Sequence, residues 1–209
     1  MVSMIANWLA AATWAEGCGA GMHPWFVHGL SLEGEAPPKD EHYRRMFLPR
    51  EQSEDTETSR DLDVLLPSLP TPTPLRVLIA ELRERMQATP QAMLGEVGLD
   101  KSFRLHYPEG SVERETRKKS SSLATPPAHQ LAVVRAQIKM ALELRRNISF
   151  HSVRVQGDTR QLLDELKRDD LERWRRVYVC LHSFGGSAEV ASQIQKGTSG
   201  AGHSASPSC

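Results

Sequence analysis

The sequence has few cysteines, no net charge and no long apolar run, and each shortage excludes a class of protein. Its three cysteines form no C-x-x-C pair, so we expect neither a zinc finger nor a disulfide framework. Lysine plus arginine and aspartate plus glutamate number 26 each, so no net basic field favours non-specific binding to nucleic acid or membranes. No run of 18 apolar residues predicts a membrane span. A reducing compartment, cytoplasmic or nuclear, fits best.

The chain of 209 residues, 39% of them hydrophobic, has the size of one domain with a modest core. We expect a single domain over residues 1–196 and a Gly/Ser-rich, disordered tail over 197–209. Residues 33–74 are rich in proline and charge, which is typical of a polar surface insertion with short helical pieces.

The remaining chain predicts alternating strands and helices. Strands are expected at 92–100, 148–151 and 177–182, helices at 75–87, 127–146 and 158–171, and a polar loop at 108–122. The strands are apolar on both faces, as parallel strands covered by helices are. The order therefore predicts an α/β fold with right-handed crossovers.

Three polar residues stand at or near the ends of these strands: Glu96, His151 and His182. The two histidines are 31 residues apart (182 − 151), about one βα unit. Because the carboxyl ends of parallel strands open on one face, we expect the three side chains to converge there. A carboxylate with two imidazoles can bind zinc, manganese or iron. Equally, each residue alone can be an ordinary polar residue or a helix cap.

Four short motifs follow one another along the chain: Gly21–Met22–His23–Pro24, Leu94–Gly95–Glu96–Val97–Gly98–Leu99–Asp100, Phe150–His151–Ser152 and Leu181–His182–Ser183–Phe184–Gly185–Gly186–Ser187. In this order they resemble the motifs of the TatD family of metal-dependent deoxyribonucleases. The insertion looks most like the fungal branch of this family, whose members are described as interacting with a tetratricopeptide subunit of the anaphase-promoting complex. The resemblance implies a possible protein partner of that kind.

The resemblance also implies a TIM-type (β/α)₈ barrel of the amidohydrolase superfamily that uses two divalent metal ions (Mg²⁺, Mn²⁺ or Zn²⁺) to hydrolyse the phosphodiester bonds of DNA. Carried over by position, Glu96 would be the catalytic residue that bridges the metals, and His151 and His182 would bind the second metal. His23 would line the substrate mouth, or else belong to a turn stiffened by the following proline. Arg154 would contact phosphate.

The sequence departs from the family pattern at both ends. It has no His-x-His motif, which binds the first metal in the family, and no late-strand aspartate follows the His182 motif. We therefore expect a truncated barrel without its first and last strands, at most one well-supported metal, and weak or no activity for this chain alone. Two alternatives stay open: a non-enzymatic interaction scaffold, and a hydrolase with a small-molecule substrate.

Three further residues in or next to these motifs also carry expectations. Trp25 and Phe26 are expected in the core rather than stacked on a base. Asp100 is expected to hold its loop by hydrogen bonds rather than to bind metal.

Overall fold

The computed structural model describes residues 19–48, 56–116, 119–182, 185 and 189. Its main feature is a four-stranded parallel sheet in the order β1-β4-β5-β6. The strands are β1 (Gly19–Ala20), β4 (Met93–Asp100), β5 (Ile148–Val153) and β6 (Val179–His182). The parallel α/β arrangement agrees with the prediction, and the carboxyl ends of all four strands open at one edge of the sheet.

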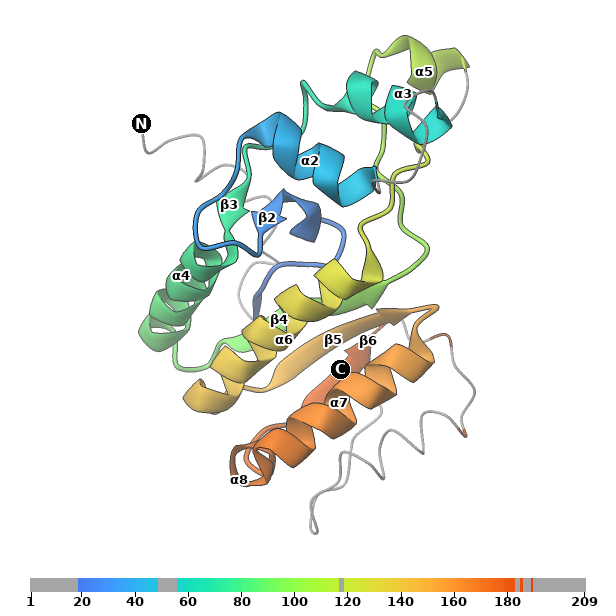
Figure 1. The fold of residues 1–209 in the computed structure, drawn as a ribbon. Coiled ribbons are helices and arrows are strands. Elements are labelled where there is room, and N and C mark those ends of the chain that lie inside the picture. The colour runs from blue at the N-terminus through green and yellow to red at the C-terminus, as the bar shows by residue number, and fades with distance from the viewer. Residues whose placement is uncertain (1–18, 49–55, 117–118, 183–184, 186–188, 190–209) are drawn as a thin grey trace.

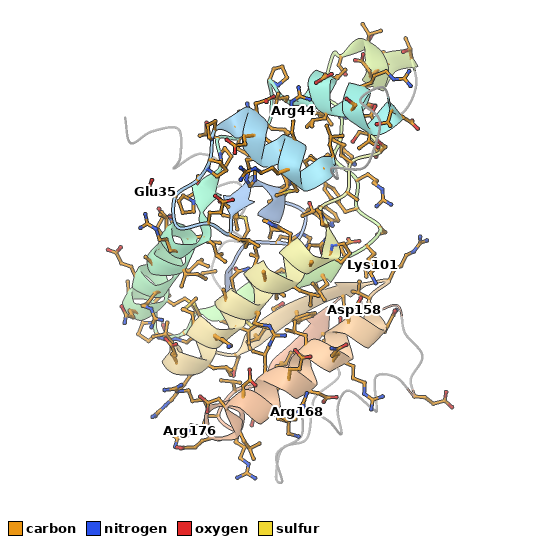
Figure 2. All side chains as sticks on the ribbon, viewed as in Figure 1. Glu35, Arg44, Lys101, Asp158, Arg168 and Arg176 are labelled. Carbon is orange, nitrogen blue, oxygen red and sulfur yellow. The ribbon has the colours of Figure 1, made fainter. Side chains whose placement is uncertain are left out.

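Three long helices provide the connections between the strands. They are α4 (Leu75–Ala88), α6 (Pro127–Leu144) and α7 (Gln156–Asp169), and the short α8 (Leu171–Trp174) precedes β6. Figure 1 shows α6 and α7 side by side in front of the sheet. Lys101, just after β4, forms an ion pair with Asp158 in α7 at 2.6 Å, and both are labelled in Figure 2.

The main core lies between the sheet and these helices. The apolar stripe of α4 is buried at Leu78, Leu82 and Met86, spaced four residues apart as a helix requires. Phe150 of β5 is fully buried in this core, which it shares with apolar residues of all three helices. Full burial of an apolar side chain of this kind contributes about 1.5–3 kcal/mol.

The insertion forms a second, smaller core. Its helices α2 (Lys39–Phe47) and α3 (Glu57–Leu65) pack on the segment that follows β4, and β2 (Leu30–Ser31) pairs with β3 (Thr73–Pro74) below them. The buried apolar residues of this cluster are Tyr43, Phe47, Leu62, Leu65, Leu69, Leu105, Tyr107 and Leu123. The expected short helices are present, and they cover the segment after β4 rather than standing apart from the domain.

Some expectations about individual elements are wrong. β1 is not among the strands expected from the sequence, and the predicted loop at 108–122 contains the short helix α5 (Val112–Thr116). Leu171 begins α8 and is 42% exposed, although the sequence predicted it as the last residue of the preceding helix. Cys180 is disulfide-bonded, which the sequence did not lead us to expect.

Two further points concern the predicted tail and the possibility of a membrane-spanning helix. The predicted tail at 197–209 lies outside the described residues. Among the described helices, none combines the length and the apolar character needed to cross a membrane.

Candidate metal centre

The site is built at the carboxyl edge of the sheet, where β4, β5 and β6 lie in register. Gly98 pairs with His151, and His151 pairs with His182. A Cβ at Gly98 would lie 2.0 Å from the carbonyl oxygen of His151, so only glycine permits this close approach of the strands. The register shifts between Leu94 and Val97, which places Glu96 in an irregular step of β4.

Three side chains meet at this edge: His23, Glu96 and His151. One ligand atom from each lies within 4.8 Å of the others. Nδ1 of His151 is 3.1 Å from Oε1 of Glu96, and Nε2 of His23 is 3.8 Å from Oε2 of the same carboxylate. The side chain of Glu96 is 39% exposed, whereas that of His151 is 6% exposed, so the carboxylate opens the cluster to solvent.

Asp100 supports this cluster from behind. Its Oδ2 is 3.2 Å from Nε2 of His151 and accepts a hydrogen bond from Nε1 of Trp25 at 2.7 Å. Its Oδ1 accepts hydrogen bonds from the backbone N–H and the hydroxyl of Ser102 and from the N–H of Phe103. Desolvation alone would raise the pKa of Asp100, but the hydrogen bonds from Ser102, Trp25 and His151 outweigh it and lower the pKa to about 2. Asp100 is therefore a buried, ionised acceptor.

The contact with Asp100 favours one tautomer of His151, because an ionised carboxylate can only accept a hydrogen bond. When Nε2–H donates to Asp100, the neutral ring presents its Nδ1 lone pair toward Glu96. Two acceptors, this nitrogen and a carboxylate oxygen, then face each other, and a cation between them satisfies both. A carboxylate that orients a metal-binding histidine in this way is a common arrangement around protein metals.

His23 has the protonation state that a ligand needs. Burial, and secondarily the neighbouring His151, lower the pKa of His23 to about 4. The ring is therefore neutral at pH 7, and a neutral imidazole is the form that binds metal. The His23 and His151 rings contact each other edge to face, with centroids 4.5 Å apart and planes at 68°. The donor set of two imidazoles and one carboxylate therefore fits a divalent cation, zinc and manganese included.

Two glutamines of α6 bind the backbone of the two segments that carry the site, the loop with His23 and the end of β4. Oε1 of Gln137 accepts the N–H of Met22, and its Nε2 donates to the Met22 carbonyl. Gln130 makes the same two bonds to the backbone of Asp100, at 2.8 and 3.0 Å. The loop that carries His23 and the end of β4 are thus both attached to one helix.

The predicted residues are distributed unevenly around this site. The structure brings His23, expected at the substrate mouth, into the cluster with Glu96 and His151. The backbone of His182 pairs with that of His151, and its side chain lies outside the described part of the structure. Arg154 is exposed just after β5, with a left-handed φ of 56°, and is not a member of the cluster.

The expectations for the neighbouring residues have mixed outcomes. Asp100 does hold its loop by hydrogen bonds, as expected, but its contact with His151 was missed. Phe26 is partly buried and packs on the main core, whereas Trp25 is 38% exposed, so the prediction of a core position for Trp25 is wrong. Because the two residues of β1 carry no strand pattern, the sequence contains no sign that the Gly21–Pro24 motif follows a strand end.

Comparison with known proteins places these motifs in a family. The family profile described as TatD related DNase matches residues 5–206. The chain is 27% identical to Cut9-interacting protein scn1 of Schizosaccharomyces pombe, over 83% of this chain and 58% of that protein. It is 29% identical to the uncharacterized deoxyribonuclease YMR262W of Saccharomyces cerevisiae, over 82% of this chain and 50% of that protein.

The chain thus spans between half and three fifths of the length of these relatives. No solved structure matches it significantly. The fold of the family is the TIM-type barrel of the amidohydrolase superfamily that the resemblance implied, and the parallel sheet described above is consistent with part of such a barrel. Since the profile covers nearly the whole sequence, the chain belongs to the TatD-related DNase family.

Proposed function

We propose that this chain supplies the metal centre of a hydrolase that cleaves the phosphodiester bonds of DNA. Membership of the TatD-related DNase family and the relative named as a deoxyribonuclease support a nuclease-type hydrolase. The observation that carries the proposal is the cluster of His23, Glu96 and His151, with Asp100 buried behind it.

In this proposal the three clustered side chains hold one divalent cation, Mg²⁺, Mn²⁺ or Zn²⁺. A bound cation would activate water for attack and neutralise charge on the phosphate. His182, next to His151 across β5 and β6, would add a further imidazole to the same edge.

The chain's own residues prepare this site for a substrate. Asp100 holds His151 in one tautomer, and Glu96 keeps a solvent-exposed carboxylate at the open side of the cluster. Arg154, exposed after β5 at the same edge, would attract the phosphate of the substrate.

The experiment is a cleavage assay on a 5′-labelled oligonucleotide with Mn²⁺ or Zn²⁺, together with calorimetric titration of the metal. Glu96→Gln should lower cleavage by about a hundredfold or more and weaken metal binding, because an amide is a poorer metal ligand than a carboxylate. Glu143→Gln is the matched control, because Glu143 pairs with Arg83 on the surface. Equal cleavage by the Glu96 and Glu143 variants would contradict the proposal.

A second candidate function is binding to a protein equivalent to Cut9, with or without catalysis. The name of the scn1 relative supports it, and the insertion supplies a separately packed surface formed by α2 and α3. The two functions predict different results for Glu96→Gln. A scaffold keeps its protein partner in a pull-down with this variant, and an enzyme loses turnover.

A further inference from the structure

Trp25 is an exposed aromatic side chain that is nevertheless held in place. It is 38% exposed, yet its ring stacks on Phe103 with centroids 4.8 Å apart and planes at 10°. Its Nε1 donates to the buried carboxylate of Asp100 at 2.7 Å. A ring fixed by one face and by its polar edge loses little further freedom when a ligand stacks on its remaining surface.

This ring borders the metal centre. Its centroid lies 4.8 Å from that of His23 and 6.2 Å from that of His151, with planes at 81° and 80°. Trp25 therefore adds an aromatic surface directly beside the polar cluster of His23, Glu96 and His151. Any substrate whose phosphate reaches the cluster brings its neighbouring groups close to this surface.

The chemistry of the surface selects what can bind there. The indole N–H is already used by Asp100, so the exposed part of Trp25 offers aromatic carbon surface and no hydrogen-bond donor. A nucleobase is the flat group attached to a phosphodiester backbone, and stacking on aromatic rings suits every base. Such stacking is tolerant of sequence because it reads no hydrogen-bonding edge.

We propose that Trp25 is a base-stacking residue, and that the site recognises a nucleobase next to the phosphate as well as the phosphate itself. This inference rests on the proposed function, since it assumes a nucleic-acid strand as the substrate. Trp25 is then a specificity-determining residue. Because of it, the protein binds strands that carry bases more tightly than strands of equal charge that lack them.

Trp25 could also act only through Asp100, and two substitutions separate these roles. Trp25→Phe removes the N–H donor and keeps an aromatic face, whereas Trp25→Leu removes both. Tyr178→Leu is the matched control, because Tyr178 is also exposed (51%) but precedes β6, at the opposite edge of the sheet.

The test compares two fluorescently labelled strands of equal length, an oligothymidylate and an abasic strand, by fluorescence anisotropy in EDTA. The unchanged protein and the Tyr178→Leu control should bind the base-bearing strand roughly tenfold to a hundredfold more tightly than the abasic strand. Trp25→Leu should lose this preference, and Trp25→Phe should keep most of it. Equal affinity of the unchanged protein for both strands, or binding of neither, overturns the proposal.

The unchanged protein alone supplies the first comparison, so the test does not depend on the folding of a variant. Circular dichroism identifies a Trp25→Leu protein that fails to fold, and Trp25→Phe then supplies the second comparison: loss of the preference in that variant overturns the stacking role. Addition of Mn²⁺ to the bound strands tests the proposed nuclease separately. Preference without cleavage refutes the nuclease and retains stacking, whereas cleavage without preference does the reverse.

Discussion

Replacement of Asp100 by asparagine should change the tautomer of His151, moving its proton from Nε2 to Nδ1. The asparagine oxygen can still accept from the loop donors that now bind Oδ1, which leaves the amide NH₂ toward His151 and Trp25. An NH₂ beside Nε2 of His151 favours the tautomer with its proton on Nδ1. That proton then points toward Glu96, where the cation would bind.

The expected losses of metal affinity and of folding stability can both be estimated from these contacts. Removal of a carboxylate behind a metal-binding histidine typically weakens metal binding by 10- to 100-fold, about 1.4–2.7 kcal/mol. The N–H of Trp25 loses its acceptor, and the free energy of unfolding should fall by about 1–3 kcal/mol. Calorimetric titration with Zn²⁺ or Mn²⁺ measures the first quantity, and urea unfolding of the metal-free protein measures the second.

Asp158→Asn is the control, because it makes the same chemical change at an exposed ion pair with Lys101. Such a pair contributes about 0–1 kcal/mol to stability, and its loss should leave metal affinity unchanged. If folded Asp100→Asn protein binds metal as tightly as the Asp158 variant, the argument that Asp100 selects the tautomer of His151 is refuted.

Three further predictions concern stability. Burial lowers the pKa of His28 from 6.5 to about 4, so on acidification this histidine is protonated in the unfolded chain before it is protonated in the folded protein. About 3 kcal/mol of stability should therefore be lost as pH falls from 6.5 to 4, and urea midpoints that stay constant across this range would contradict this. Gly98→Ala should prevent correct folding, because its Cβ would overlap the backbone of β5, whereas Gly157→Ala meets no atom within 4 Å and should unfold at the same or a higher temperature. Tyr107→Phe removes a hydroxyl that donates to buried Asp61 and should cost about 1–3 kcal/mol, measured by urea unfolding; an unchanged midpoint would refute a stabilising role for this bond.

The convergence of Glu96 and His151 could be predicted from the sequence because it follows from topology alone. The two residues stand in adjacent parallel strands, Glu96 midway along β4 and His151 in the second half of β5, and the carboxyl ends of such strands meet at one edge. The strands could be identified by their apolar composition, and their pairing needed only the alternating order of strands and helices along the chain. The roles of these residues as ligands are proposals that rest on this placement.

The positions of His23 and Trp25 could not be predicted, because tertiary contacts determine them. β1 has only two residues, Gly19 and Ala20, and their composition carries no strand pattern. Trp25 is held at the surface by Phe103 and Asp100, more than seventy residues away in the chain. An aromatic residue next to an apolar one favours a core interpretation until these distant partners are known.

The attachment of both halves of the site to α6 has a consequence for how the site moves. Gln130 and Gln137 are seven residues apart, nearly two helical turns, so their amides project from one side of the helix. A displacement of α6 therefore carries the His23 loop and the end of β4 together, and the spacing between the ligand groups is preserved while the whole assembly shifts. One residue inserted between the two glutamines would turn one amide by about 100° relative to the other, and a single attachment would then remain.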